Sequence, residues 1–228
     1  MPEWEVASRD RATVAGVDVG GVKKGFHAVV LRKGQCFDKL TTPNAAEVVT
    51  WCRDHQASVI GIDAPCQWRA TRRARACERE LARLGMSAFF TPSRKIGEAR
   101  PFYRWMVNGA VLFKLFAPHY RLYDGLPPLE PLCFETFPQA IASALAGKTL
   151  SAKDKRVDRR RLLRIAGVET NSLTNIDEID AALCALAALR VLLGTFKTYG
   201  DAAGGFILVP TLRKPQACRP SARPFLSP

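Results

Sequence analysis

The chain has 228 residues, of which 47% are hydrophobic and 24% are charged, and its formal net charge is +13. This length suits one sizeable core with a small insertion and is short for two full domains. No apolar run is long enough to cross a bilayer, and the first residues lack the basic and apolar regions of a secretory signal, so we expect no membrane association. The positive charge also serves solubility, but it favours a polyanionic partner, because such a field attracts phosphates.

The seven cysteines lie mostly inside apolar segments, and none forms a Cys-x-x-Cys pair. This usage indicates reduced core thiols in a cytoplasmic protein rather than disulfides or a zinc site. The three histidines, His27, His55 and His119, are scattered without the spacing of metal ligands. We therefore expect each of them to be structural.

The first half of the domain has the pattern of a strand meander. Residues 1–12 are polar, and we expect a flexible N-terminus. Three strands follow at Thr13–Val19, Phe26–Leu31 and Gln35–Thr41, joined by turns short enough for antiparallel hairpins. The single domain is expected to extend from residue 13 to residue 209.

A helix then leads to a fourth strand. Asn44 is placed as its N-cap, with Glu47 reaching back as in a capping box. The helix returns the chain to Val59–Asp63, and such a crossover favours a strand parallel to the first.

Residues 66–131 are predicted to form a helical insertion. The arginine-rich segment Arg69–Leu84 has a helical pattern, and a second helix is expected from Pro101 to a point before Pro118. We interpret the apolar and aromatic residues of the second helix as core rather than as a surface for stacking bases. These residues are Phe102, Trp105, Met106, Leu112, Phe113 and Phe116.

The chain after the insertion alternates strand and helix. Leu132–Glu135 is a strand, and the helix after it opens at Pro138 and is closed by Gly147. Residues 148–166 predict a basic helix, whose charge a solvated face would explain equally well.

The last long helix begins near Thr174 and Asn175 and is apolar nearly all round from Ile179 to Leu193, which predicts burial. Phe206–Val209 is a candidate short strand. Residues 210–228 have the composition of a Pro-rich basic tail.

Several carboxylates in this pattern lack an obvious partner. Asp18 lies inside an apolar strand, where burial is costly unless a cation meets it, although a bond to turn amides is the simpler alternative. Asp63 and Glu135 each end a further apolar strand, so three strands could deliver acids to one sheet edge. Asp177 and Asp180 share one helix face. Asp177 suits a helix cap, whereas Asp180 lies within the apolar part of the helix and needs a cation.

These residues lie in motifs that resemble a known family. The motifs are Gly-Val-Asp18-Val-Gly, Gly-Ile-Asp63-Ala-Pro, the helix from Cys77 to Gly85, Phe-Glu135-Thr-Phe-Pro and Asp177-Glu-Ile-Asp180-Ala-Ala-Leu. Over residues 13–210 their order resembles an uncharacterised domain-of-unknown-function family, regarded as predicted nucleases with a ribonuclease-H-like fold.

The resemblance implies an α/β fold with a mixed five-stranded sheet of order 3-2-1-4-5 and helices on both faces. The resolvase branch of this superfamily ends with two aspartates three apart, similar to Asp177 and Asp180. Its second acid is commonly Glu, whereas this chain has Asp63, which is one methylene shorter.

The function implied is a metal-dependent nuclease that hydrolyses phosphodiester bonds with two Mg²⁺ ions, or Mn²⁺ as a substitute. We assign Asp18 to bridge both ions, Asp180 to the nucleophile side and Asp63 to the leaving-group side. Glu135 and Asp177 are second choices, as an extra ligand or a proton carrier. The nucleic-acid backbone would be positioned by Lys23, Lys24, Arg72, Arg73, Arg160 and Arg161. The type of nucleic acid stays open, and so does a homodimer.

Two other functions remain open. A nucleotide-binding phosphotransferase of the actin and sugar-kinase type shares the sheet topology, and Asp18 with Gly20 and Gly21 half-matches its phosphate loop. No Thr or Ser follows, however, and the chain is short for paired domains. The third possibility is a nucleic-acid-binding module whose acids no longer hold metal.

Overall fold

The computed structural model describes residues 13–86, 89–151 and 153–211, and the statements below concern these residues. The expected flexible N-terminus, 1–12, and all but the first two residues of the expected tail lie outside the described part. None of the described helices is long and apolar enough to cross a membrane. The six cysteines in the described part are free thiols.

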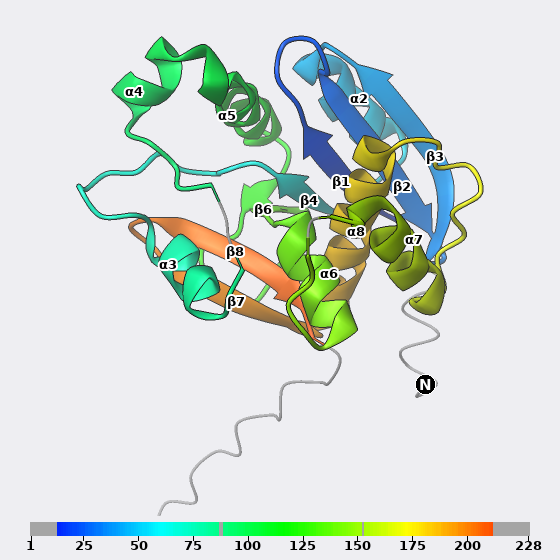
Figure 1. The fold of residues 1–228 in the computed structure, drawn as a ribbon. Helices are drawn as coiled ribbons and strands as arrows, with labels where there is room; N and C mark the ends of the chain where they lie inside the picture. The colour runs from blue at the N-terminus through cyan, green and yellow to red at the C-terminus, as the bar shows by residue number, and fades with distance from the viewer. Residues whose placement is uncertain (1–12, 87–88, 152, 212–228) are drawn as a thin grey trace, which may run out of the picture.

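One mixed sheet runs through the molecule (Figure 1), with the order β3-β2-β1-β4-β6-β8-β7 and β5 paired to β6. The strands β1, β2 and β3 are antiparallel neighbours, whereas β1, β4 and β6 run parallel. The strands are β1 (Thr13–Val19), β2 (Phe26–Arg32), β3 (Gln35–Thr42), β4 (Val59–Asp63), β5 (Arg121–Leu122), β6 (Leu132–Glu135), β7 (Phe196–Asp201) and β8 (Gly205–Pro210).

The first five strands in this order confirm the expected 3-2-1-4-5 topology, and the fold is ribonuclease-H-like. The expected number of five strands is wrong, because the sheet has eight within the described residues. The hairpin of β7 and β8 extends the sheet past β6. The sequence did not predict β7, because Phe196–Asp201 contains Lys197, Gly200 and Asp201 and has only a weak strand pattern.

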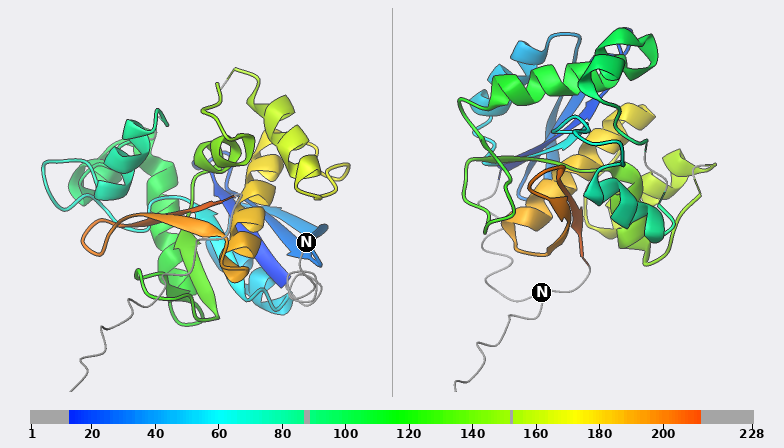
Figure 2. Two further views of the ribbon diagram at one scale, coloured as in Figure 1. Left: turned by 90° about the horizontal axis from the view of Figure 1, so that it is seen from below. Right: turned by 90° about the vertical axis from the view of Figure 1, so that its left-hand side faces the viewer.

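Helices cover both faces of the sheet (Figure 2). One core lies between the sheet and α2 with α5, and the other lies between the sheet and α8 with α6 and α7. A third, smaller cluster joins α3 to β7 and β8. The helices are α2 (Ala45–Asp54), α3 (Ala76–Arg83), α4 (Arg94–Ala99), α5 (Arg104–Phe116), α6 (Pro138–Ala146), α7 (Lys155–Ile165) and α8 (Ile176–Leu192), with a 3₁₀ turn at Pro101–Tyr103.

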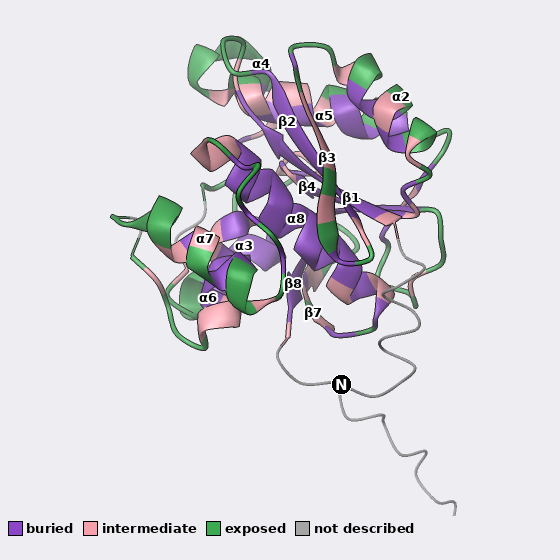
Figure 3. Ribbon diagram, turned by 90° about the vertical axis from the view of Figure 1, so that its right-hand side faces the viewer, coloured by how far each residue is buried: buried purple, intermediate pink, exposed green. Residues whose placement is uncertain are grey.

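The helix α8 is buried along nearly its whole length (Figure 3), as its apolar sequence predicts. It lies directly on the backbone of β1 and β4. A Cβ on Gly16 would lie 2.0 Å from the backbone nitrogen of Ala185, and a Cβ on Gly61 would lie 2.5 Å from the carbonyl oxygen of Cys184. Gly16 and Gly61 are register partners, and this glycine pair leaves the space in which the backbone of α8 packs against the sheet.

Several predicted helices differ in extent. The arginine-rich helix begins only at Ala76, because the guanidinium of Arg75 is drawn into the protein interior by Glu78 and Glu135. The basic helix begins at Lys155 rather than near residue 148.

Two local predictions also need correction. Asn44 caps α2 as expected, but Glu47 accepts a hydrogen bond from the Thr42 hydroxyl instead of closing a capping box. In the expected core stripe, Met106 is buried, whereas Phe102 is 62% exposed, because the 3₁₀ turn before α5 carries it out of the helical register.

Candidate functional site

The site begins with two carboxylates on neighbouring strands. Asp18 on β1 and Asp63 on β4 are direct register partners in parallel strands. Along β1, Val17 and Val19 enter the core beneath α2 and α5, so alternation turns Asp18 to the α8 face, as predicted. The two carboxyl groups lie within hydrogen-bond reach of each other.

The helix α8 brings a third carboxylate to this pair. Cys184 and Ala185 of α8 contact Gly16 and Gly61. Asp180 lies about one turn earlier on α8, toward Asp18 and Asp63, which follow these glycines by two residues. Asp180 is buried, and Nη1 of Arg159 on α7 donates a 2.5 Å bond to its Oδ1.

Burial and mutual repulsion change the titration of this cluster. Burial raises the pKa of Asp18 to about 7, and the negative charges of Asp180 and Asp177 act in the same direction. Burial, and next the charge of Asp18, raise the pKa of Asp63 well above its usual value. The pKa of Asp180 is also raised by burial, although Arg159 opposes this effect. These shifts mark carboxylates that are desolvated close to one another, with too little positive charge to compensate.

Asp177 lies at the edge of the cluster rather than at its centre. The N-cap of α8 is Asn175, which accepts from the backbone of Glu178, so Asp177 is not the capping residue. Its carboxylate instead binds Nζ of Lys24 at 2.8 Å. Lys24 comes from the turn between β1 and β2, and the ion pair therefore joins that turn to the start of α8.

Glu135 does not belong to the cluster, which corrects the prediction that it could act as an extra ligand. Cys133 on the same strand enters the core beneath α2 and α5, so alternation turns Glu135 to that face and away from Asp18. There Arg75 binds both of its oxygens, at 2.6 and 2.7 Å, and the backbone of Cys66 donates to it. Glu135 is thus one half of a buried structural ion pair.

A cavity of about 540 Å³ opens above the carboxylates. Its floor contains Asp18, Asp63, Asp177 and Asp180. Basic side chains, one amide and apolar side chains complete its lining. The lining includes Lys24, Lys155, Arg159 and Gln139 as polar groups and Met86, Phe89, Trp105 and Phe137 as apolar ones.

The carboxylates of the cavity can supply some, but not all, of the ligands of a divalent cation. In the part of the chain that the structure describes, no three His, Cys, Asp or Glu side chains are close enough together to enclose a metal ion. Asp18 and Asp63 nevertheless offer adjacent hard oxygen ligands, and neither has an ion pair with a basic side chain within the described ranges. Mg²⁺ is commonly held by one or two carboxylates together with water and substrate phosphates, so this pair suffices for such a site.

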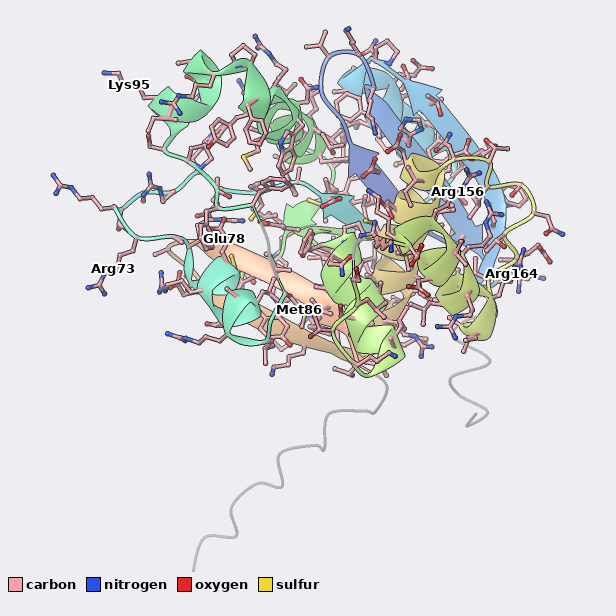
Figure 4. All side chains as sticks on the ribbon, in the orientation of Figure 1. Arg73, Glu78, Met86, Lys95, Arg156 and Arg164 are labelled. Carbon is pink, nitrogen blue, oxygen red and sulfur yellow. The ribbon has the colours of Figure 1, made fainter. Side chains whose placement is uncertain are left out.

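The predicted backbone-binding residues do not form one surface. Lys24 lines the cavity and Lys23 stands exposed next to it. Arg72 and Arg73 are exposed before α3, and Arg73 extends from the side of the molecule opposite to Arg164 (Figure 4). On α7, Arg161 is exposed, whereas Arg160 donates to the carbonyl oxygens of Thr170 and Leu173 and holds that loop.

Sequence reasoning missed Arg159 and Gln139. Arg159 was one arginine among many in a basic run, and only the structure shows that it is buried and turned inward. Its Nη2 donates to Oε1 of Gln139, and its Nε has no hydrogen-bond partner in the described part of the protein. A usable signal was the buried Leu162 and Leu163, since they fix which side of α7 faces the protein.

Fold and site together define a ribonuclease-H-like protein with a buried carboxylate cluster. The chain belongs to the family described as protein of unknown function (DUF429), whose model matches residues 16–203, and this confirms the resemblance drawn from the motifs. The chain is also similar to Thermus thermophilus RuvC, with 17% identity over 82% of this chain and 98% of that chain and a TM-score of 0.41. It is similar as well to the structure of T. thermophilus RuvC in complex with Holliday junction substrate. Here the sequence identity is 19%, the match covers 83% of this chain and 98% of that chain, and the TM-score is 0.42. No curated protein sequence matches the chain.

Proposed function

We propose that this protein is a metal-dependent nuclease that hydrolyses phosphodiester bonds at the cavity above Asp18 and Asp63. The observation that carries the proposal is the register pair of carboxylates, Asp18 and Asp63, whose pKa values are raised by desolvation and by neighbouring negative charge. Such a pair is costly for the folded protein unless a cation joins it. The basic rim of the cavity supports a phosphate-bearing substrate.

Asp18 and Asp63 would hold the first ion, and Asp180 would join when Arg159 releases its carboxylate. Bound divalent ions would stabilise charge on the phosphate and lower the pKa of the attacking water. Nη1 of Arg159 lies 2.5 Å from Oδ1 of Asp180, so the guanidinium neutralises this carboxylate. When a phosphate enters, the same guanidinium can donate to its oxygens, because a planar fork of N–H groups suits phosphate as well as carboxylate. Lys24 would hold the neighbouring phosphate.

The test compares Asp18→Asn and Asp180→Asn with the wild type and with Asp54→Asn. Asp54 is exposed at the end of α2 and does not line the cavity. The substrates are a single strand, a duplex, a hybrid and a branched junction, each with Mn²⁺ or Mg²⁺. We expect Asp18→Asn to abolish cleavage, because Asn keeps the shape and removes the charge that attracts the ion.

Mn²⁺ binding to the metal-stripped protein is measured in parallel. We expect Asp18→Asn to weaken it at least tenfold and Asp54→Asn to leave it unchanged. Cleavage by Asp18→Asn at the wild-type rate would overturn the nuclease proposal. Metal binding without cleavage of any substrate would favour a binding module instead.

A further inference from the structure

We propose that an aromatic wall beside the carboxylates receives an unpaired base, so that the substrate is nucleic acid in single-stranded form at the site of cleavage. This inference rests on the proposed function and names the substrate class of the same cavity. The aromatic wall consists of Phe89, Phe102, Tyr103 and Trp105. Phe89 and Trp105 line the cavity that contains Asp18 and Asp63.

The rings of the wall form a continuous series. The centroids of Phe89 and Trp105 are 6.3 Å apart, those of Phe89 and Phe102 are 5.9 Å apart, and those of Phe102 and Tyr103 are 5.0 Å apart, all edge to face. Phe89 is 64% exposed and Phe102 is 62% exposed. Ring faces are therefore open to solvent beside a charged cavity, where a nucleobase can stack on them.

Trp105 of the wall is held in place relative to the carboxylates through α5. The side-chain amide of Asn108 donates to the carbonyl oxygen of Gly20, two residues after Asp18. A Cβ on Gly109 would lie 2.3 Å from the Cβ of Ala64, the residue directly after Asp63. Because α5 contacts the chain just beyond each carboxylate, the ring of Trp105 one turn earlier has a set place beside the cavity. Such preorganisation suits a binding surface.

The charges next to the wall are complementary to a nucleic-acid backbone. Lys23, Lys24 and Arg104 line a second hollow together with Pro101, the first residue of the turn that carries Phe102. Lys155 and Arg159 line the main cavity from α7. Basic groups that flank exposed aromatic side chains, on which bases can stack, are the arrangement by which proteins bind single strands without reading sequence.

Duplex nucleic acid does not fit this arrangement. The volume of about 540 Å³ is within the range of pockets that enclose small ligands. A base within a duplex is stacked and paired, and it reaches the ring faces of the aromatic wall only after unpairing, which costs free energy. A base that is already unpaired avoids this cost. The cavity therefore selects single-stranded segments, whether DNA or RNA.

The experiment measures binding by fluorescence anisotropy in Ca²⁺ at fixed salt. Three probes of equal length are compared: a single-stranded DNA oligonucleotide, its blunt duplex, and a single strand in which the central bases are replaced by abasic sugars. The proteins are the wild type, Phe89→Leu, Trp105→Leu and, as a matched control, Phe37→Leu. Phe37 is 53% exposed on β3 and does not line the cavity.

We expect the wild type to bind the single strand about tenfold more tightly than the abasic probe or the duplex, since stacking of one base has an effect of this size. Trp105→Leu and Phe89→Leu should lose that preference and keep their affinity for duplex and for Mn²⁺. Phe37→Leu should behave as the wild type. The side chain of Phe89 is mostly exposed, so Phe89→Leu should fold normally and keeps the test valid if Trp105→Leu is unstable.

Equal affinity of the wild type for the intact and the abasic strand, or an unchanged preference in both wall variants, would overturn the inference. Cleavage that still depends on Asp18 would then leave the proposed function intact. Conversely, base-dependent binding that requires Trp105, with no cleavage of any substrate, would support the aromatic wall and contradict the nuclease.

Discussion

At the scale of single residues, the charge that would bind metal also destabilises the metal-free protein. Burial raises the pKa of Asp18 to about 7 from an ordinary value of 3.8. The folded protein therefore holds this proton more tightly than the unfolded chain does. The resulting stabilisation is complete below pH 4 and is lost as pH rises from about 4 to about 7.

We predict that Asp18→Asn raises the free energy of unfolding of the metal-stripped protein at pH 8 by on the order of 2 kcal/mol, because the substitution removes a buried carboxylate that is ionised there. At pH 4 the difference should shrink toward zero. Urea unfolding in EDTA at both pH values measures this, with Asp54→Asn as the control. A destabilised Asp18→Asn at pH 8 would mean that the carboxylate has a cationic partner within the protein.

At the scale of secondary-structure elements, the site depends on how closely α8 approaches the sheet. The glycine pair allows the approach, and Asp18 and Asp63 each follow their glycine by two residues on the same face. We predict that Gly16→Ala costs roughly 3 kcal/mol or more, since its Cβ would overlap the backbone of α8. Gly21→Ala should change stability by less than about 0.5 kcal/mol, because its Cβ meets nothing within 4 Å.

Thermal and urea unfolding of both variants measure this effect. A Gly16→Ala protein as stable as Gly21→Ala would show that α8 can shift away from the sheet. If it does shift, Asp180 should move with it, and Mn²⁺ affinity should fall in Gly16→Ala even where the fold survives.

The same elements show how far the sequence determines the site. The repeated Gly-x-Asp pattern at Asp18 and Asp63 was visible, and alternation along strands was enough to place both on one face. The same rule, applied through Cys133, would have excluded Glu135, which was instead grouped with the acids because it also ends a strand. Arg75 could not be paired with Glu135 from the sequence, since 60 positions separate them and only the folded chain brings them together.

At the scale of the whole molecule, the net charge of +13 overstates the charge available for binding. Arg75 and Arg159 form ion pairs with buried carboxylates, and Arg156 and Arg160 donate hydrogen bonds to loop carbonyls. The net charge of the sequence favoured a polyanionic partner. The sequence alone does not show which arginines form contacts within the fold and which are exposed to solvent. Apart from Arg159, the cations beside the cavity among the described residues lie on the β1–β2 turn, at the start of α5 and at the start of α7: Lys23, Lys24, Arg104 and Lys155.

This distribution predicts a moderate salt dependence. If about four phosphates are contacted, the slope of log affinity against log salt for a single strand should be about −3, because each neutralised phosphate contributes about −0.7. Replacing Lys23 and Arg104 together by Gln should make the slope less steep by about 1.4. Replacing Arg72 and Arg73 by Gln should change it less, since these side chains do not line the cavity. Anisotropy titrations from low to high salt give the slopes, and a steeper loss for the Arg72 and Arg73 variant would place the backbone path across the loop before α3 instead.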